Sequence, residues 1–311
     1  MILTGLVNIG NTCYINSVLQ CFINDPLFRE KIKDDEYISK IYNMIQIDDL
    51  IPPKVVCVNI INFIKVFMKS KYMFFNFMGH NDSHEFLVCL LDFLIEKYKK
   101  PPSPKKFERD CSWEFFLNRN NHELTRMYYG QIKNSITCVK CNNVSHRYEE
   151  FNTINLNLNV SRSTENNLTD MFIKYLKPEI QNDSDNLYFC DNCKCNTVSI
   201  KNVSLWRLPP RLIIVLKRYS ATDNKIISKI SYPIDDMKIK ETMSGIVNNY
   251  SLYSTVNHYG NTNTGHYIAN VKINNNWYLI DDTHIEQTKL SNNDPHVYIL
   301  FYGNTTSRLL E

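Results

Sequence analysis

The chain has 311 residues, of which 43% are hydrophobic and 22% are charged, a composition that is typical of globular proteins and excludes an intrinsically disordered chain. Its formal net charge is +3, which is too small to indicate a nucleic-acid partner. No apolar run reaches the roughly 18 residues of a membrane-spanning helix, and the opening residues, MILTGLVNIG, lack the features of a secretory signal. We therefore expect no nucleic-acid or membrane partner.

The first expected element is a helix near 12–23, within the segment GLVNIGNTCYINSVLQCF that starts at Gly5. Its apolar residues recur at the i, i+3, i+4, i+7 spacing of one helix face: Ile15, Val18, Leu19 and Phe22. Asn11 and Thr12 are both common N-cap residues. Cys13 then lies in the first turn, where the helix dipole favours a thiolate over a thiol. Because a thiolate attacks carbonyl carbons, Cys13 is a candidate nucleophile that needs a base and an orienting group.

Two further helices are expected near 54–69 and 82–99, and Asp82 and Glu85 are placed to cap the start of the second one. A short helix is expected over 112–118. From about residue 128 the pattern changes to strands, which are expected at 155–160, 212–216, 251–256, 267–273, 277–280 and 297–302. Helices followed by strands indicate an α+β protein with a cleft between its two parts.

Four of the ten cysteines form two C-x-x-C pairs, Cys138 with Cys141 and Cys190 with Cys193. Without a secretory signal the cysteines are expected to be reduced, so metal binding or catalysis is favoured over disulfides. Two such pairs complete a tetrahedral zinc site, and four thiolates leave no open position, so one zinc ion would be structural. A metal-free motif and a redox motif are the alternatives, although no thioredoxin-like pattern accompanies the pairs. Cys195 is close enough in sequence to replace one ligand.

The best candidate base is His266, which follows a loop rich in Asn, Thr and Gly and opens an expected strand. The next strand ends in Asp281 and Asp282. A turn at 274–276 would bring His266 beside these carboxylates, and a carboxylate that binds one imidazole nitrogen leaves the other to take the proton of Cys13. A cysteine, a histidine and an aspartate far apart in sequence also occur by chance. The assignment of Cys13, His266 and Asp281 as catalytic residues therefore depends on the motifs around them. The sequence alone does not decide between the two carboxylates.

Motifs in a fixed order extend over nearly the whole chain, from Gly5 to about Gly303. GLVNIGNTCYINSVLQCF resembles the cysteine box of the ubiquitin-specific proteases, and NHYGNTNTGHYIANV, WYLIDD and VYILFY resemble their histidine box. GHNDSHEFL resembles a second box, YYGQIKNSITCVKC and CDNC resemble the zinc-bearing fingers, and LWRLPPRLIIVLKRY resembles the strand before the final third. By this ordered set the chain is identified as a member of that family of deubiquitinating cysteine peptidases.

The resemblance implies a papain-like, hand-shaped α+β fold in a single catalytic domain over 1–311, without accessory modules. A helical thumb would cover about 1–125, zinc-bound fingers would be drawn from about 130–205, and a β palm would come mainly from 206–305. The active cleft would lie between thumb and palm. The chain would act as a monomer on ubiquitin and ubiquitinated proteins, in the cytoplasm or nucleus of a eukaryotic cell, or of the host cell if the protein is viral.

The same resemblance implies the catalytic roles. Cys13 would be the nucleophile, His266 the general base and Asp281 its orienting partner. Asn8 matches the oxyanion-hole asparagine of the family, with a simple turn residue as the alternative. Asp282 would share the polarising or oxyanion role.

Four residues are expected to contact the substrate: Asp82, His84, Tyr267 and His258. Asp82 matches a position that meets the basic tail of ubiquitin, and a plain helix cap is the alternative. His84 would lie near the same groove. Tyr267 would wall the channel for the two terminal glycines, because a channel too tight for any Cβ selects for glycine. Ordinary strand packing is the alternative for Tyr267.

The implied activity is hydrolysis of the (iso)peptide bond after the C-terminal glycine of ubiquitin, through an acyl-enzyme on Cys13. A peptidase for a ubiquitin-like modifier and a catalytically inactive ubiquitin-binding module are the alternatives. The chain departs from the family pattern at two places. His80 and Asn81 stand where the family usually has two glutamines, which puts contacts near the tail groove in doubt, and Tyr219 stands where it usually has phenylalanine.

Overall fold

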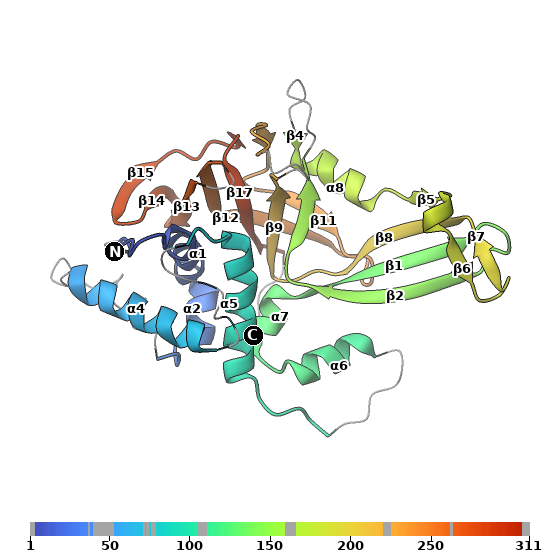
Figure 1. The fold of residues 1–311 in the computed structure, drawn as a ribbon, viewed down its shortest axis with the longest axis horizontal. Coiled ribbons are helices and arrows are strands. Elements are labelled where there is room, and N and C mark those ends of the chain that lie inside the picture. Colours follow the sequence, from blue (N-terminus) through green and yellow to red (C-terminus); the bar gives the residue numbers. More distant parts are fainter. Residues whose placement is uncertain are drawn as a thin grey trace.

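The computed structural model describes residues 4–36, 38–39, 53–70, 72, 75, 79–104, 111–158, 166–219, 225–261 and 264–306. Most helices of the first third lie below a large sheet in the view of Figure 1, and a long ribbon of strands extends to the right, away from both. The expected α+β class is confirmed. Within the described ranges, no helix combines the length and apolarity needed to cross a membrane.

Helices make up most of the first third of the described chain, as the apolar spacing predicts. They are α1 Cys13–Ile23, α2 Pro26–Ile32, α4 Pro53–Lys69, α5 Ser83–Tyr98, α6 Ser112–Arg119 and α7 Glu123–Tyr128, with α8 Leu168–Leu176 and a 3₁₀ helix Ser184–Asn186 later in the chain. Asp82 caps α5, because its Oδ1 accepts from the backbone N–H groups of His84 and Glu85 at 2.7 and 3.0 Å. The predicted cap is therefore confirmed. Helices α2, α7 and α8 were not predicted. Helices α2 and α7, with 7 and 6 residues, are too short for a helical period to stand out.

The central sheet has eight strands in the order β15-β14-β13-β12-β17-β9-β3, with β11 paired to β12. Their bounds are β3 Ile154–Asn157, β9 Arg211–Lys217, β11 Met237–Lys240, β12 Val247–Gly260, β13 Gly265–Ile273, β14 Asn276–Asp281, β15 His284–Thr288 and β17 Val297–Asn304. The β3–β9 pair is parallel and the other pairs are antiparallel. The strand expected at 155–160 begins at Ile154 and ends at Asn157, and residues 159 and 160 lie outside the described residues.

A four-stranded sheet, in the order β2-β1-β8-β5, forms the ribbon. Its strands are β1 Gly130–Cys138, β2 Val144–Phe151, β5 Glu179–Gln181 and β8 Ser199–Arg207. A hairpin of β6 Tyr188–Cys190 and β7 Cys195–Thr197 lies at the far end of the ribbon (Figure 1). A small sheet joins β4 Asn166–Asn167, β10 Ile230–Ser231 and β16 Asn293–Asp294.

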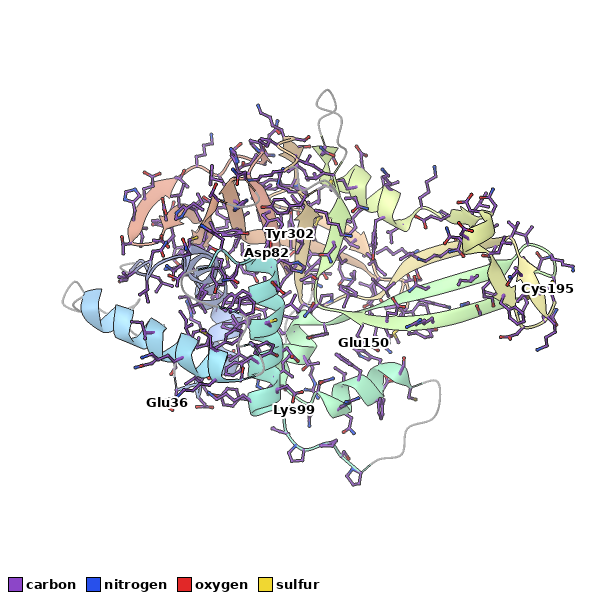
Figure 2. All side chains as sticks on the ribbon, viewed as in Figure 1. Glu36, Asp82, Lys99, Glu150, Cys195 and Tyr302 are labelled. Atoms are coloured by element: carbon purple, nitrogen blue, oxygen red, sulfur yellow. The ribbon has the colours of Figure 1, made fainter. Side chains whose placement is uncertain are left out.

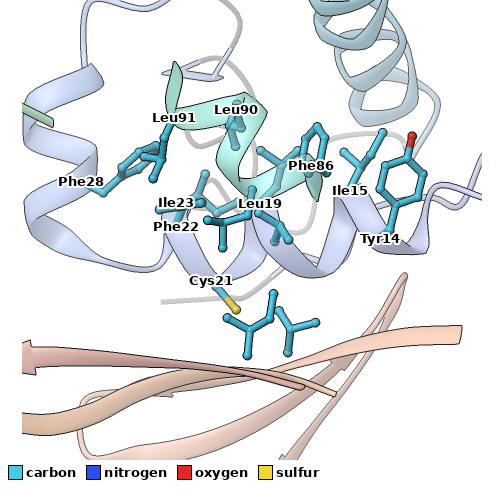
Figure 3. Packing of buried hydrophobic residues seen from close by; sticks show 14 of the residues in the cluster. Tyr14, Ile15, Leu19, Cys21, Phe22, Ile23, Phe28, Phe86, Leu90 and Leu91 are labelled. Atoms are coloured by element: carbon cyan, nitrogen blue, oxygen red, sulfur yellow. The ribbon is translucent and has the colours of Figure 1, made fainter. Parts of the chain in front are cut away.

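Helix α1 lies between α5 and the strands of the central sheet (Figure 3). Every residue of α1 is buried. In Figure 3, Cys21 points toward the sheet, whereas Leu90 of α5 lies on the opposite side of α1. Phe22 ties this helix to three other elements, since its ring centroid lies 4.8 Å from that of Phe28 in α2, 5.4 Å from Tyr128 in α7 and 5.7 Å from Phe301 in β17.

Strand β9 explains the uninterrupted apolar run LIIVL, because both of its faces are buried. Ile213 and Val215 belong to the core that contains α1. Leu212, Ile214 and Leu216 belong to a second core, on the opposite face of the sheet, that also contains residues of α8 and β3. Successive side chains of a strand point to opposite faces, so one short strand contributes to both cores.

The Phe22→Ala substitution should lower the free energy of unfolding by about 3–5 kcal/mol, because it removes a fully buried ring that contacts three elements and leaves a cavity. Urea denaturation followed by circular dichroism measures the change. Phe115→Ala is the control, because the Phe115 side chain on α6 is 54% exposed and its loss should change stability by no more than about 0.5 kcal/mol. Equal effects of the two substitutions would contradict the role given to Phe22.

Candidate active site

The loop before α1 brings Asn8, Thr12 and Cys13 to one junction. Cys13 is the first residue of α1, and 5% of it is exposed. Thr12 is the N-cap residue, as predicted, but its side chain does not cap the helix: Thr12 Oγ1 instead accepts from the backbone N–H of Ile9 at 3.0 Å. The backbone N–H of Thr12 donates to Asn8 Oδ1 at 3.0 Å. These contacts shape the loop, so the Asn8 side chain is held beside the start of the helix.

His266 and Asp281 lie on neighbouring strands of the central sheet. The β13–β14 register pairs Ala269 with Ile280, which brings the start of β13 beside the end of β14. His266 Nε2 and Asp281 Oδ1 are 2.5 Å apart, so Nδ1 is the ring nitrogen left for the thiol of Cys13. A hydrogen bond to Cys13 is the largest cause that raises the pKa of His266, to about 9, and Asp281 adds to it against the opposing effect of burial. The imidazole is therefore protonated near neutral pH.

Asp282 has different partners from its neighbour. Its Oδ2 accepts from Asn8 Nδ2 at 2.9 Å, and its Oδ1 accepts from Asn16 Nδ2 at 2.7 Å. The distance from Asp282 Oδ2 to His266 Nε2 is 4.0 Å, compared with 2.5 Å for Asp281. The structure therefore separates the two carboxylates that the sequence analysis left unresolved: Asp281 contacts the base, and Asp282 contacts the amide of Asn8.

Sequence reasoning missed Asn16. The signal in the sequence is a carboxamide within the expected helix. In the structure only 2% of Asn16 is exposed, and every other residue of α1 is buried as well. A buried polar side chain of this kind requires hydrogen-bond partners and so indicates a specific contact.

A pocket of about 330 Å³ lies beside His266, and we call it the Asp82 pocket. Its lining residues come from the loop before α5 and from the strands around the candidate base: His80, Asn81, Asp82, Tyr219, His258, Gly265 and Tyr267. Three of the four expected substrate contacts therefore share one pocket. Besides capping α5, Asp82 accepts through Oδ2 from the Tyr298 hydroxyl at 2.8 Å, so its helix-cap role is present whether or not it binds a ligand.

His258 and Gly265 set the width of the Asp82 pocket. A Cβ atom on Gly265 would lie 1.9 Å from His258 Nε2, so no other residue fits there without displacing the imidazole. The His258 Nδ1 atom lies 2.9 Å from the Tyr219 hydroxyl. Burial, followed by the positive charge of Lys225, lowers the pKa of His258 to about 4, so this ring is neutral. The Tyr267 ring packs against it with centroids 4.4 Å apart.

His84 does not lie with these residues. Its Nε2 is 3.2 Å from Thr153 Oγ1, on the connection between β2 and β3, and it is not among the described residues that line the Asp82 pocket. The imidazole therefore lies toward the connection between β2 and β3, and its contact with the substrate stays a prediction. Its backbone N–H is used by the Asp82 cap, which turns the His84 side chain along α5.

A larger hollow, of about 660 Å³, lies between the ribbon, α8 and the end of β9, and we call it the ribbon hollow. Ribbon residues such as Ile132 and Arg147 line it, together with Tyr175 of α8. Lys217 at the end of β9 also lines it, and Tyr219, two residues further along the chain, lines the Asp82 pocket. Both concavities are therefore lined by residues at or just after the end of β9.

The four cysteines of the two C-x-x-C pairs come together at the far end of the ribbon. The Sγ atoms of Cys138 and Cys193 are 4.0 Å apart, and those of Cys141 and Cys190 are 3.6 Å apart. All four lie within 4.8 Å of one another, so they form a potential metal site. Cys195 is not a member of this group: it pairs with Cys190 across the β6–β7 hairpin, and its Sγ lies 3.9 Å from Lys140 Nζ. Figure 2 shows Cys195 at the ribbon end and Asp82 near the centre of the molecule.

Comparison with known proteins agrees with this geometry. Over residues 4–302 the chain matches the family model described as ubiquitin carboxyl-terminal hydrolase. It is 27% identical to ubiquitin carboxyl-terminal hydrolase Usp2 of Drosophila melanogaster, over 97% of this chain and 35% of that protein. It is 26% identical to ubiquitin carboxyl-terminal hydrolase 2 of Rattus norvegicus, over 96% of this chain and 54% of that protein. For ubiquitin carboxyl-terminal hydrolase 4 of Arabidopsis thaliana the identity is 27%, over 98% of this chain and 94% of that protein.

Two solved structures share the fold. The SAGA Ubp8/Sgf11/Sus1/Sgf73 DUB module bound to ubiquitin aldehyde superposes with a TM-score of 0.73 and 22% identity, over 97% of this chain and 69% of that chain. The yeast SAGA DUB module with a mutant Sgf73 gives a TM-score of 0.75 and 22% identity, over 97% and 68%. The expected papain-like hand is thus the fold of known deubiquitinase modules. Since the family model matches almost the entire sequence, this chain belongs to the ubiquitin carboxyl-terminal hydrolase family of ubiquitin-specific proteases.

Proposed function

We propose that this protein is a thiol-dependent deubiquitinase that hydrolyses the (iso)peptide bond after the C-terminal glycine of ubiquitin. The observation that carries the proposal is the hydrogen-bonded pair of His266 and Asp281, whose imidazole interacts with Cys13, the first residue of α1, and has its pKa raised by this interaction. The Asn8 amide lies on the loop that leads to the same cysteine. The names of the family and of its relatives support the same activity.

In the proposed reaction, the Cys13 sulfur attacks the carbonyl carbon of the terminal glycine, and the negative oxygen of the tetrahedral intermediate accepts a hydrogen bond from the Asn8 amide. The His266 imidazolium donates its proton to the leaving amine, the C–N bond breaks and a thioester to Cys13 remains. Neutral His266 then takes a proton from a water molecule, which attacks the thioester and releases the carboxylate of ubiquitin. Asp281 keeps Nδ1 of the ring directed at the sulfur.

The Asp82 pocket is the proposed site for the tail of ubiquitin. Asp82 has two protein donors on Oδ1 and one on Oδ2, and a carboxylate with about four acceptor sites retains capacity for one basic side chain of the tail. The rings of Tyr267 and His258 narrow the pocket, which favours residues without a Cβ. His84 has no part in this proposal, because its ring contacts Thr153 instead.

The ribbon hollow is the proposed site for the globular body of ubiquitin, because Lys217 lines it only two residues before Tyr219, which lines the Asp82 pocket. In this arrangement the thumb covers about 1–125, the fingers are drawn from about 130–205 and the palm comes mainly from 206–305. Strand β3 falls within the finger range but pairs with β9 in the central sheet. We propose that the chain acts as a monomer in the cytoplasm or nucleus, on ubiquitin and ubiquitinated proteins.

The four clustered cysteines fit one structural zinc ion. Four sulfur atoms placed tetrahedrally at about 2.3 Å from zinc lie about 3.8 Å from each other, and two of the sulfur pairs here are 3.6 and 4.0 Å apart. The Thr197 hydroxyl, 3.3 Å from Cys138 Sγ, is the largest cause that lowers the pKa of this thiol, to about 6, which favours the thiolate that a metal binds. With four thiolate ligands the ion would hold the end of the fingers together and take no part in the hydrolysis.

The purified protein should hydrolyse ubiquitin-aminomethylcoumarin and react with a ubiquitin C-terminal electrophile. Cys13→Ala should abolish both, and Cys111→Ala, at a half-buried cysteine before α6, should leave both unchanged. Asn8→Ala should lower kcat by roughly 10²–10³-fold, because one oxyanion donor is lost. If the unmutated protein neither hydrolysed ubiquitin-aminomethylcoumarin nor reacted with the ubiquitin electrophile, the proposal would be wrong. Labelling by electrophiles of ubiquitin-like modifiers alone would assign one of those modifiers as the substrate, and ubiquitin binding without turnover would indicate a binding module.

The pKa of His266 should depend on Cys13. The hydrogen bond to the cysteine stabilises the charged ring and raises its pKa to about 9, so Cys13→Ala should bring the pKa down toward the ordinary value of about 6.5, with Asp281 still in place. NMR titration of the imidazole between pH 5 and pH 10 measures the shift, and Cys111→Ala serves as the reference. An unchanged pKa in Cys13→Ala would show that the thiol and the imidazole do not interact.

The proposed zinc site can be tested by metal analysis of cysteine variants. The wild-type protein should contain one zinc ion per chain, and Cys138→Ser or Cys190→Ser should lose it, destabilise the fingers and weaken ubiquitin binding, while alkylation of Cys13 by iodoacetamide continues. Elemental analysis and ubiquitin titration measure these effects. Cys195→Ser is the matched control, because Cys195 lies on the same hairpin and outside the four-sulfur cluster. Metal-free wild-type protein, or equal zinc loss in the control, would contradict the assignment.

A further inference from the structure

We propose that Asn16 is a positioning residue of the active site: through Asp282, it holds the amide of Asn8 in the orientation that stabilises the oxyanion. This inference rests on the proposed hydrolase function and extends it to a residue that touches neither the thiol nor the base. The observation that carries it is the carboxylate of Asp282, which accepts one hydrogen bond from Asn8 and one from Asn16 through its two oxygens.

The Asn8 side chain is held at both ends. Its Oδ1 accepts from the backbone N–H of Thr12 at 3.0 Å and from Thr12 Oγ1 at 3.3 Å. Its Nδ2 donates to Asp282 Oδ2 at 2.9 Å. A carboxamide nitrogen carries two hydrogens, so one N–H is anchored on Asp282 and the other remains for the substrate oxygen. The direction of the second N–H therefore follows the position of the Asp282 carboxylate.

Asn16 fixes that carboxylate from the buried side. It lies three residues after Cys13, so both residues move with α1. Its Nδ2 donates to three oxygen atoms: Asp282 Oδ1 at 2.7 Å, the carbonyl oxygen of Leu6 at 3.2 Å and that of Val7 at 3.3 Å. A hydrogen-bond donor is required in this position, because an acceptor would face three other acceptors. Asn16 thus joins the nucleophile's helix to the turn that follows β14.

The backbone holds Asp282 in an unusual conformation that supports this role. Its φ angle is 50°, in the left-handed region that aspartate adopts more readily than most residues. The carbonyl of Asp282 accepts from the backbone N–H of Leu6 at 2.9 Å. A Cβ atom on Gly5 would lie 2.3 Å from the same carbonyl oxygen, so glycine is needed for this approach. The segment before α1 and the turn after β14 are therefore joined at backbone level as well.

The role of Asp282 differs from that of Asp281. Asp281 contacts His266, so its loss should change the pKa of the base and the reactivity of the thiol. Asn16 contacts the anchor of the oxyanion amide and has no hydrogen bond to the base, so its loss should affect the steps in which a tetrahedral oxyanion forms. A misplacement of catalytic groups by about 1 Å costs on the order of 10² in rate, and the loss of an entire oxyanion donor costs roughly 10²–10³.

The test compares Asn16→Leu with Gln20→Leu. Gln20 lies one turn further along α1, is 1% exposed and donates to Thr4 O at 3.1 Å without contacting Asp282, so its loss removes a similar buried hydrogen bond. Asn16→Leu should lower kcat on ubiquitin-aminomethylcoumarin roughly 10- to 100-fold and leave KM unchanged. It should weaken the binding of ubiquitin aldehyde by a similar factor, because the aldehyde forms a tetrahedral adduct, and should leave the binding of ubiquitin unchanged. Alkylation of Cys13 by iodoacetamide, which forms no oxyanion, should keep its rate. Gln20→Leu should keep kcat.

A second pair of variants keeps the test decisive if Asn16→Leu does not fold. Asn16→Asp places acceptor against acceptor and should lower kcat. Adding Asp282→Asn should recover at least part of the loss, because the carboxamide introduced at position 282 can donate to the carboxylate introduced at position 16 and still accept from Asn8. Wild-type kcat in Asn16→Leu, an equal loss in Gln20→Leu, an equal loss of iodoacetamide reactivity, or no recovery in the double variant would overturn the inference. Absence of turnover in the wild-type protein would instead overturn the proposed function itself, and the inference with it.

Discussion

The complete burial of α1 is the constraint on which the site depends. The helix packs on β13 and against α5, so the candidate nucleophile at its first residue lies in the same close-packed core as Tyr267, which follows the candidate base in β13 (Figure 3). Protein interiors have few voids, and a shift of α1 along β13 would open cavities or force overlaps. The geometry between Cys13 and His266 is thus set by helix-on-sheet packing and not by a flexible loop.

The end of β14 shows how one short segment serves two chemical tasks. A regular strand would direct Asp281 and Asp282 to opposite faces of the sheet. The strand ends at Asp281, and the left-handed backbone of Asp282 carries its carboxylate back to the loop before α1. One carboxylate therefore contacts the imidazole while the next contacts two carboxamides. The positive φ angle of Asp282 thus directs two adjacent carboxylates to different partners.

Much of the fold could be predicted from local patterns. Long helices with a regular apolar stripe, the doubly buried run in β9 and the paired cysteines each leave a signal that depends only on nearby residues. The same holds for the Asp82 cap, which is formed within three residues. Short helices such as α7 were missed because their stability comes from packing and not from a repeated period.

The site was harder to predict, because its details depend on contacts between distant segments. The motifs indicated Cys13, His266 and the carboxylate pair, yet the partner of each carboxylate follows from how the turn after β14 meets the loop before α1. His84 lies in a matching motif, but its side-chain direction follows from the helix cap and from Thr153. Asn16 was hidden for the same reason, since its partners lie elsewhere in the chain.

Strand β9 has a mechanical consequence. Its alternate residues belong to the core beneath the helices and to the core beneath α8, so a shift of this one strand would disturb the packing of both cores. Adjustment of the hand to a bound protein would then have to come from elsewhere. The ribbon of β1, β2 and β8 is mostly half-exposed along its length, and it is the described part of the molecule that can bend without separating a core.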